Sequence, residues 1–319
     1  MICRICANSK NNPKFQVPEM QFGTRQEFDY FQCSKCACLQ ICEIPADMRP
    51  FYPDQYYTVQ PLNEDKYTGL NGQLRILPFK ASLFPGTPFR WFLSKMIPDK
   101  HFSCLSDLDL NPTWRVLDVG CGNGKHFIYP LRQMGFENVA GCDPFISAPL
   151  TYKNGLKIEE KSLVEMAGEN RWDLITFHHS FEHIPNPAET LAHAARLLSE
   201  KGICVIRIPT SSSFAWQHYG VNWVQLDAPR HLFLHSLESM RKLAQQAAFQ
   251  ISKIVYDSDY FQFWGSKNYA DNIPLCDQKK GRGLGWQYVR WRLNRRAKML
   301  NRKSHGDQAV FVLTKTDLV

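Results

Sequence analysis

Three glycines fall within five residues near the middle of the chain, directly after an apolar run. They are Gly120, Gly122 and Gly124 in the sequence VLDVGCGNG, and Asp118 stands two residues before the first of them. A glycine-rich turn between a strand and a helix lets a ligand lie against main-chain N–H groups, because no Cβ atom stands in the way. The spacing G-x-G-x-G differs from the G-x-G-x-x-G of pyrophosphate-binding turns. Because a carboxylate in the strand would repel phosphates, the pattern favours a ligand with positive charge, such as an amino-acid ammonium.

A second acidic residue, Asp143, ends the next predicted strand in the sequence GCDP. It lies about twenty residues after the turn, where a carboxylate can accept hydrogen bonds from both hydroxyls of a ribose. A ligand with an adenosine-type sugar and a zwitterionic tail meets both conditions, and S-adenosylmethionine is such a ligand. The alternative is a glycine turn that serves only the packing of strand against helix.

The sequence FHHSFEHIPNP, residues 177–187, follows a strongly predicted strand at its carboxyl end, the edge where open α/β sheets bind ligands. If the ligand is S-adenosylmethionine, transfer of its methyl group releases a neutral thioether, so proton transfer would matter mainly at an acceptor hydroxyl. A base with a pKa near neutrality contributes about 10²- to 10⁴-fold to such a step, and imidazole suits that role. We predict His179 as the base, His183 as the second candidate and Glu182 as their orienting partner. The alternative is that such a histidine only caps the next helix or hydrogen-bonds to the backbone.

A long loop follows the next strand, in the sequence YGVNWVQLDAPRHLFLHS. It carries Trp223, Arg230 and His231, and an aromatic platform beside an arginine can recognise a sugar or a phosphate. We therefore predict these three residues as substrate-binding. A structural lid packed by aromatic side chains is an equal alternative.

Two cysteine pairs lie near the start of the chain, Cys3-x-x-Cys6 and Cys33-x-x-Cys36, separated by 26 residues. Two such pairs can supply the four thiolates of a tetrahedral zinc site, and a segment with little apolar core needs such a cross-link. Four thiolates leave no open position, so the site is expected to be structural. Cys38 or Cys42 could replace Cys36 as a ligand.

Short β-rich runs alternate with segments of helical spacing from Trp114 onward, which is typical of a parallel sheet with crossover helices. We predict an α/β, Rossmann-like, mostly parallel sheet of seven strands with helices on both faces, preceded by a small zinc-ribbon-like domain. The expected boundaries are 1–48 for the zinc-ribbon-like domain, 49–110 for a connecting helical segment, and 111–319 for the main domain. A basic helical insertion is expected within the main domain at about 257–306.

The formal charge of +8 is concentrated in residues 279–303, which hold ten Lys and Arg and no Asp or Glu. Apolar residues spaced by three or four predict a basic amphipathic helix there. Such a helix could contact an anionic membrane, a glycolipid or a partner chain, or it could simply dock on the core. No apolar stretch reaches the roughly 18 residues that cross a bilayer, so we expect a cytoplasmic protein, peripheral at the inner membrane surface at most.

Residues 114–256 resemble the class I S-adenosylmethionine-dependent methyltransferases, since VLDVGCGNG matches their first motif and Asp143 their ribose-binding acid. The runs H-x-x-E-H and W-x-x-x-D-x-P-R-H, with the N-terminal cysteine pairs, resemble a branch that acts on sugars and surface polysaccharides. The resemblance implies S-adenosylmethionine and structural zinc as cofactors. It implies a set of cofactor-binding residues: Asp118, Gly120, Cys121, Gly122, Gly124, Asp143, Pro144, Ser162 and His178.

The leading functional hypothesis is therefore methyl transfer to a sugar hydroxyl of a nucleotide sugar, polysaccharide or glycolipid, in surface-glycan biosynthesis. One alternative is an RNA methyltransferase, because a zinc ribbon and a basic helix also suit RNA. Nucleic acid is nevertheless not expected, since acidic residues dilute the positive charge outside the basic block. The other alternative is a methyltransferase-like protein that binds a partner without catalysis.

Overall fold

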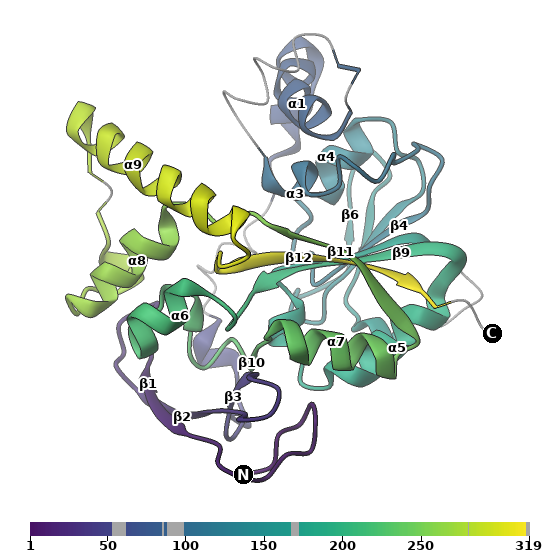
Figure 1. The fold of residues 1–319 in the computed structure, drawn as a ribbon. Coiled ribbons are helices and arrows are strands. Elements are labelled where there is room, and N and C mark those ends of the chain that lie inside the picture. Colours follow the sequence, from purple (N-terminus) through teal and green to yellow (C-terminus); the bar gives the residue numbers. More distant parts are fainter. Residues whose placement is uncertain (53–61, 85, 88–98, 167–171, 280, 317–319) are drawn as a thin grey trace. The chain divides into compact units, whose positions relative to one another are not determined.

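The computed structural model describes residues 1–52, 62–84, 86–87, 99–166, 172–279 and 281–316 (Figure 1). Much of the connecting segment expected over 49–110 lies outside these residues, including most of the sequence FYPDQYY. In the part that is described, this segment contains the helices α1 (Gly69–Leu83) and α3 (Lys100–Ser103).

The contacts divide the chain into two compact units, each built from separate stretches of sequence. The first unit comprises Met1–Phe51, Phe181–Leu191 and Arg207–Phe311. The second unit comprises Tyr52–Ser180, Ala192–Ile206 and Val312–Val319. The three sequence segments expected as domains remain a prediction about which parts fold independently.

Among the described residues, the larger sheet has eight strands in the order β11-β12-β9-β8-β4-β5-β7-β6. Seven of them are the strands that the sequence predicts: β4 (Val116–Val119), β5 (Val139–Cys142), β7 (Lys157–Glu159), β8 (Trp172–His178), β9 (Leu198–Pro209), β11 (Phe249–Tyr256) and β12 (Gln308–Lys315). The eighth, β6 (Leu150–Thr151), pairs antiparallel with β7 and is too short for its alternation to be recognised in a sequence. The Rossmann-like α/β fold is confirmed, with one strand more than the seven expected.

Parallel strands form the centre of the second unit. β4 pairs with β5 on one side and with β8 on the other, both in parallel. All four residues of β4 are buried, as expected for a strand covered on both faces of a sheet. The register places Asp118 beside Gly141 of β5 and Thr176 of β8. The glycine turn follows β4 and leads to α4 (Ile128–Gln133).

In the described part of the first unit, a four-stranded antiparallel sheet has the order β1-β2-β3-β10. Its strands are β1 (Lys14–Pro18), β2 (Glu27–Gln32), β3 (Leu39–Ile41) and β10 (Phe233–Leu234). The cysteine-rich N-terminal segment thus shares a sheet with a strand from the loop that the sequence predicts as substrate-binding.

Several helices begin with the residues that favour helix termini. Pro187 occupies the first position of α5 (Pro187–Leu197), where its missing N–H costs no hydrogen bond. Ser236 caps α7 (Leu237–Gln246), and its hydroxyl accepts a hydrogen bond from the Ser239 N–H. The remaining α-helices of the first unit are α6 (Phe214–Tyr219), α8 (Phe261–Ala270) and α9 (Gly283–Arg302).

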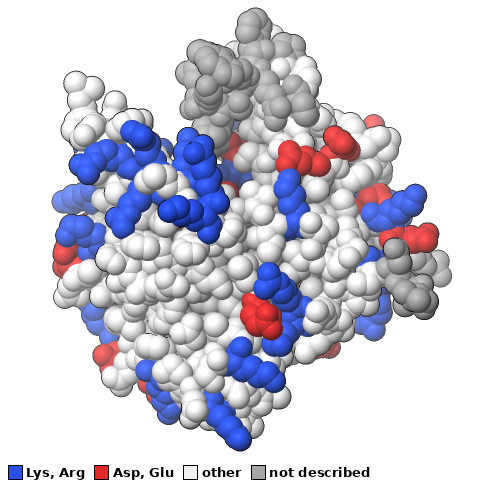
Figure 2. All heavy atoms as spheres, viewed as in Figure 1, with Lys and Arg blue, Asp and Glu red and all other residues white. Residues whose placement is uncertain are grey.

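The helix α9 covers most of the basic block, and Figure 2 shows Lys and Arg side chains gathered over it. Along α9, only Ala297 is fully buried, while Trp286 packs edge-on against Trp264 of α8 with ring centroids 5.7 Å apart. The outer face exposes large apolar side chains: Leu284, Tyr288, Trp291 and Met299. Within the described ranges, no helix combines the length and the apolar character needed to span a membrane.

Candidate functional site

The glycine turn begins with a backbone that only glycine tolerates at this place. Gly120 has a φ of +70°, in the left-handed region. A Cβ atom at Gly120 would lie 2.4 Å from the Cβ of Ser180, whose hydroxyl donates a hydrogen bond of 2.5 Å to the Val119 carbonyl. The first glycine therefore allows the end of β8 to pack against the turn.

Asp118 lies at the end of β4 with its carboxyl group buried. Its Oδ1 accepts a hydrogen bond of 2.7 Å from the Thr176 hydroxyl on β8. Burial raises the pKa of Asp118 to about 8, and the nearby Asp143 also raises it. A cation bound at this carboxyl group would favour its ionised form, which fits a ligand with an ammonium or sulfonium group.

Asp143 follows the neighbouring strand β5 and holds the turn in place. Its Oδ2 accepts a hydrogen bond of 2.8 Å from the Gly122 N–H, and its Oδ1 accepts one of 2.8 Å from the Phe145 N–H. Burial raises the pKa of this carboxyl group as well. Each carboxylate oxygen has two acceptor positions, so two remain for the hydroxyls of a ribose. The pair of acids and the glycine turn thus fit an adenosine with a cationic tail.

The other residues predicted to bind the cofactor have local contacts of their own. Cys121 is half-buried, and desolvation raises the pKa of its thiol well above the ordinary value, whereas Pro144 is exposed. Ser162 begins a short 3-10 helix, Leu163–Glu165, and its hydroxyl donates to Glu165 Oε2 at 2.6 Å. The His178 ring packs against Phe127 with centroids 4.7 Å apart. A cofactor contact stays a prediction for these four residues.

His179, the predicted base, lies just after β8 with a half-buried side chain. Its φ is +54°, in the left-handed region, which is uncommon for a residue with a Cβ atom. Such a conformation costs about 1–3 kcal/mol and often occurs where a side chain must be held in a functional position. The geometry therefore supports a role for His179 without identifying the proton that it takes.

Glu182 and His183, the other predicted catalytic residues, belong to the first unit and lie on the 3-10 helix Phe181–His183. Burial raises the pKa of Glu182 to about 8 and lowers the pKa of His183 to about 3. His231 has a lowered pKa for the same reason. Both imidazoles are therefore neutral at pH 7. The rings of His183 and His231 meet edge to face, with centroids 4.8 Å apart.

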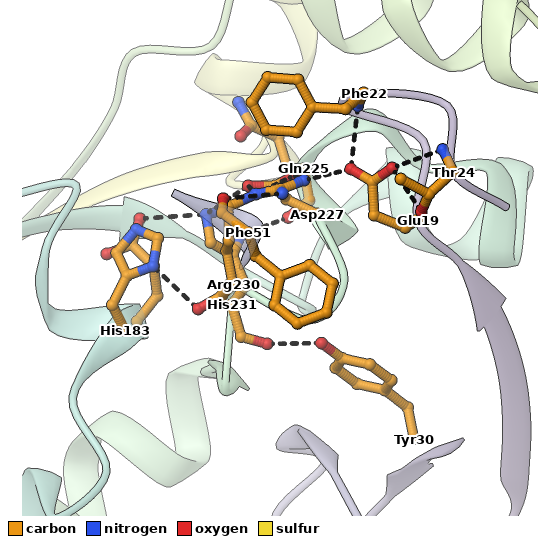
Figure 3. A network of polar contacts seen from close by, with 11 residues as sticks. Glu19, Phe22, Thr24, Tyr30, Phe51, His183, Gln225, Asp227, Arg230 and His231 are labelled. Atoms are coloured by element: carbon orange, nitrogen blue, oxygen red, sulfur yellow. Dashed lines mark hydrogen bonds and ion pairs between the residues drawn. The ribbon is translucent and has the colours of Figure 1, made fainter. Parts of the chain in front are cut away.

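Arg230 stands at the centre of a buried polar network in the first unit (Figure 3). Its guanidinium donates to Asp227 Oδ1 at 2.6 Å and to Glu19 Oε1 at 2.9 Å, and its side chain has no solvent exposure. Burial of an ion pair is costly unless its hydrogen bonds are made, and Glu19 also accepts from the Phe22 and Thr24 N–H groups. These contacts favour a structural role for Arg230 over the substrate recognition predicted from the sequence.

Trp223 is also fully buried, and its indole N–H donates to Asp307 Oδ2 at 3.1 Å. An aromatic platform for a sugar needs an exposed ring face. The position of Trp223 therefore favours the alternative of a loop packed by aromatic side chains.

The four predicted zinc ligands come together in the first unit. Cys3 Sγ lies 3.6 Å from Cys36 Sγ, Cys6 Sγ lies 3.5 Å from Cys33 Sγ, and all four sulfur atoms lie within 4.8 Å of one another. Thiolates on a tetrahedral zinc ion, with bonds of about 2.3 Å, stand about 3.8 Å apart. The cluster therefore fits zinc. Cys38 contacts His235 instead, and Cys42 contacts Met1, so the geometry favours Cys36 as the fourth ligand.

A family model described as a methyltransferase domain matches residues 91–254. This range contains the glycine turn, both aspartates and the histidines after β8. The chain belongs to this methyltransferase family.

Curated relatives of this methyltransferase carry one name. The chain is 26% identical over 219 residues to the mitochondrial ubiquinone biosynthesis O-methyltransferase of Saccharomyces cerevisiae, across 64% of this chain and 65% of that protein. It is 29% identical over 165 residues to the ubiquinone biosynthesis O-methyltransferase of Rhodopseudomonas palustris strain HaA2, across 49% of this chain and 61% of that protein. The chain thus spans less than two thirds of the length of these relatives.

Solved structures of two S-adenosylmethionine-dependent methyltransferases resemble part of the chain. The protein of Thermotoga maritima is 20% identical with a TM-score of 0.44, and the match covers 76% of this chain and 100% of that one. The protein of Archaeoglobus fulgidus is 16% identical with a TM-score of 0.41, and the match covers 72% and 100%.

Three residues that contact the predicted site residues or the turn are missing from the predictions, and a sequence signal exists for one of them. Thr176 is a polar residue inside the buried strand β8, and such a residue must find a hydrogen-bond partner. Ser180 contacts the turn through its hydrogen bond to the Val119 carbonyl, and no sequence pattern predicts this contact. Glu19 stands 211 residues from its partner Arg230, and no local pattern relates the two.

Proposed function

We propose that this chain transfers a methyl group from S-adenosylmethionine to a hydroxyl group. The observation that carries the proposal is the glycine turn between two buried aspartates, at the ends of the adjacent strands β4 and β5. Asp118 would face the cationic tail of the cofactor, and Asp143 would accept hydrogen bonds from its ribose. The curated relatives support the proposal because they are named as O-methyltransferases.

The cofactor supplies an electrophilic methyl group and leaves as a neutral thioether, so the protein acts mainly on the acceptor. In this proposal His179 takes the proton of the attacking hydroxyl, and its left-handed backbone sets the direction of its Cα–Cβ bond. Holding the hydroxyl in line with the methyl group supplies much of the remaining rate enhancement.

Two classes of hydroxyl acceptor are supported by different observations. The relatives are named for ubiquinone biosynthesis, which favours a phenolic hydroxyl with a pKa of about 10. The sequence runs H-x-x-E-H and W-x-x-x-D-x-P-R-H favour the sugar hydroxyl of a surface glycan. The family match and the names of the relatives favour both over RNA methylation and over a binding role without catalysis.

Methyl-labelled S-adenosylmethionine offered with catechol-type phenols, nucleotide sugars or bulk RNA tests the proposal. We expect label on a hydroxyl of one of the first two classes, and we expect Asp143→Ala to abolish both this transfer and the calorimetric heat of cofactor binding. An unchanged binding isotherm for Asp143→Ala would place the cofactor elsewhere. Label on RNA alone would contradict a phenol or a sugar as the acceptor.

The affinity for S-adenosylmethionine should depend on pH through Asp118. Its pKa of about 8 in the protein without cofactor means that the carboxyl group is mostly protonated below pH 8. A cationic ligand prefers the ionised form, so the affinity should fall by up to about tenfold per pH unit as the pH drops from 8 to 6. Above pH 8 it should fall again, because the α-amino group of the cofactor, with a pKa of about 8, loses its charge. Calorimetric titration between pH 6 and pH 9 measures this profile.

Asp118→Asn is the control for this profile. The amide has nearly the shape of the carboxyl group but no proton to lose, so the decline toward pH 6 should disappear and the affinity should be low throughout. A wild-type affinity that is constant from pH 6 to pH 8 would mean that Asp118 does not face the cation.

We also propose that α9 contacts an anionic surface, such as a membrane or a glycolipid. Arg290, Arg292, Arg295 and Arg296 accompany the exposed rings of Tyr288 and Trp291, a combination found in helices that lie at a membrane surface. Binding to vesicles with anionic lipid but not to neutral vesicles is the expected result, and equal binding to both would contradict the proposal.

A further inference from the structure

Two histidines and a glutamate converge in the interior of the first unit. Glu182 and His183 are adjacent on one 3-10 helix, and His231 comes from the loop before β10. A ligand atom from each of the three lies within 4.8 Å of the others. Glu182 has no solvent exposure and His231 has 6%, so the group is enclosed.

The hydrogen bonds of the two imidazoles fix which ring nitrogen carries the proton. His183 Nδ1 lies 2.8 Å from the Arg230 carbonyl oxygen, and His231 Nδ1 lies 2.7 Å from the Gln225 carbonyl oxygen. A carbonyl oxygen only accepts hydrogen bonds, so both Nδ1 atoms carry hydrogen. In each neutral ring the lone pair is then on Nε2. This arrangement, with Nδ1–H bonded to a backbone carbonyl, is typical of histidines that bind a metal through Nε2.

The Nε2 atom of His231 faces carboxylate oxygens at distances that suit a shared ion. It lies 3.9 Å from Glu182 Oε1 and 3.8 Å from Asp227 Oδ2. These distances are too long for hydrogen bonds. Nitrogen and oxygen ligands of a tetrahedral ion, with bonds of about 2.1 Å, stand about 3.4 Å apart, so the separation of His231 Nε2 and Glu182 Oε1 is within about 0.5 Å of this value.

The guanidinium of Arg230 has carboxylate partners of its own. Its guanidinium is bound by Asp227 and Glu19, and it contributes only its backbone carbonyl to His183 (Figure 3). Asp227 itself has a left-handed backbone, with a φ of +39°, which directs its carboxylate toward both Arg230 and His231. The network therefore holds both imidazoles in fixed orientations.

We infer that Glu182, His183 and His231 form a binding site for a divalent transition-metal ion. Two imidazoles and one carboxylate suit Zn²⁺, Fe²⁺, Co²⁺ or Mn²⁺, and three protein ligands leave a position open for water or another oxygen ligand. This site differs from the cysteine cluster in its ligands, since it contains no sulfur. The inference does not depend on the proposed methyl transfer, and it gives Glu182 and His183 a role other than proton transfer.

Metal content of the full-length chain tests the site, with Zn²⁺ and Co²⁺ as probes. After dialysis against Zn²⁺ and removal of free ion, Glu182→Gln should hold one equivalent less than the wild type. In a Co²⁺ titration, the bands that the wild type shows and Glu182→Gln lacks should be weak visible bands without sulfur-to-cobalt charge transfer, and Glu182→Gln should fill this sulfur-free site at least about 100-fold more weakly. Gln has the shape of Glu, so the circular dichroism spectrum and melting temperature in chelator should match those of the wild type.

Glu238→Gln and His218→Gln are matched controls, because both side chains are exposed in the same unit. Both should keep the wild-type metal content. A folded Glu182→Gln protein with unchanged metal content and Co²⁺ affinity would overturn the inference. If Glu182→Gln does not fold, X-ray absorption at the zinc edge of the wild type decides: scattering from imidazole rings supports the site, and a shell of sulfur alone overturns it.

Discussion

Gly120→Ala is expected to abolish measurable cofactor binding and to destabilise the protein. The added Cβ would lie 2.4 Å from the Cβ of Ser180 and 3.0 Å from its Oγ, closer than carbon atoms approach. Ser180 cannot turn away without losing its hydrogen bond to the Val119 carbonyl. Overpacking of this kind costs about 1–3 kcal/mol, and a left-handed alanine costs about 1–2 kcal/mol more. The turn must therefore move, and the N–H groups that would face the cofactor move with it.

Calorimetric titration with S-adenosylmethionine and thermal unfolding measure the two effects. Gly135→Ala is the matched control, because Gly135 also has a left-handed backbone, with a φ of +102°, but a Cβ there would meet nothing within 4 Å. It should lose only about 1 kcal/mol of stability and keep its affinity for the cofactor. Ser180→Gly in the Gly120→Ala background should restore part of the stability. Wild-type affinity in Gly120→Ala would mean that the turn does not contact the cofactor.

Local sequence patterns sufficed for seven of the eight strands described in the larger sheet, and for the turn. β4 is a continuous apolar run because both of its faces are buried, and the glycines mark a left-handed backbone that few other residues adopt. Both signals come from the residue types themselves. They therefore predict the place of Asp118 and Asp143 at adjacent strand ends before any contact is known.

Long-range pairing in the first unit left no such signal. β3 pairs with β10, which lies almost 200 residues later in the sequence. Arg230 likewise pairs with the distant Glu19. The burial of Arg230 and Trp223 depends on these partners, so an arginine that looks like a substrate-binding residue in the sequence is enclosed by carboxylates in the structure. A buried charge is stable only with its partners, and those partners are set by tertiary packing.

For the histidines after β8, too, the sequence predicts one part of the site and tertiary contacts determine the other. Their spacing in H-x-x-E-H predicts a functional cluster, but not which ring nitrogen is protonated or which backbone carbonyl accepts. His183 bonds to a carbonyl 47 residues away, at Arg230, and that contact decides where its lone pair points. The sequence therefore identifies residue types at the site, whereas their chemical roles depend on the fold.

Cys33→Ser is expected to release one equivalent of zinc and to lower the free energy of unfolding by several kcal/mol. The four sulfur atoms of Cys3, Cys6, Cys33 and Cys36 lie within 4.8 Å of one another, so the loss of one leaves an incomplete tetrahedral site. Binding of structural zinc contributes about 10–16 kcal/mol in isolated zinc fingers, and much of it is folding free energy. Because β2 and β3 follow Cys6 and pair into the sheet that contains β10, the destabilisation should extend to the loop before β10. Zinc content by mass spectrometry and thermal unfolding measure these effects.

Cys42→Ser is the matched control, since Cys42 lies in the same segment and contacts Met1 instead of the cluster. It should keep its zinc and change the stability by less than about 1 kcal/mol. Cys38→Ser tests whether Cys36 or Cys38 is the fourth ligand. Cys38 Sγ lies 3.9 Å from His235 Nδ1 and outside the cluster. A folded Cys38→Ser protein with full zinc content supports Cys36 as the fourth ligand. Full zinc content in Cys33→Ser would show that the cysteine cluster does not hold the ion.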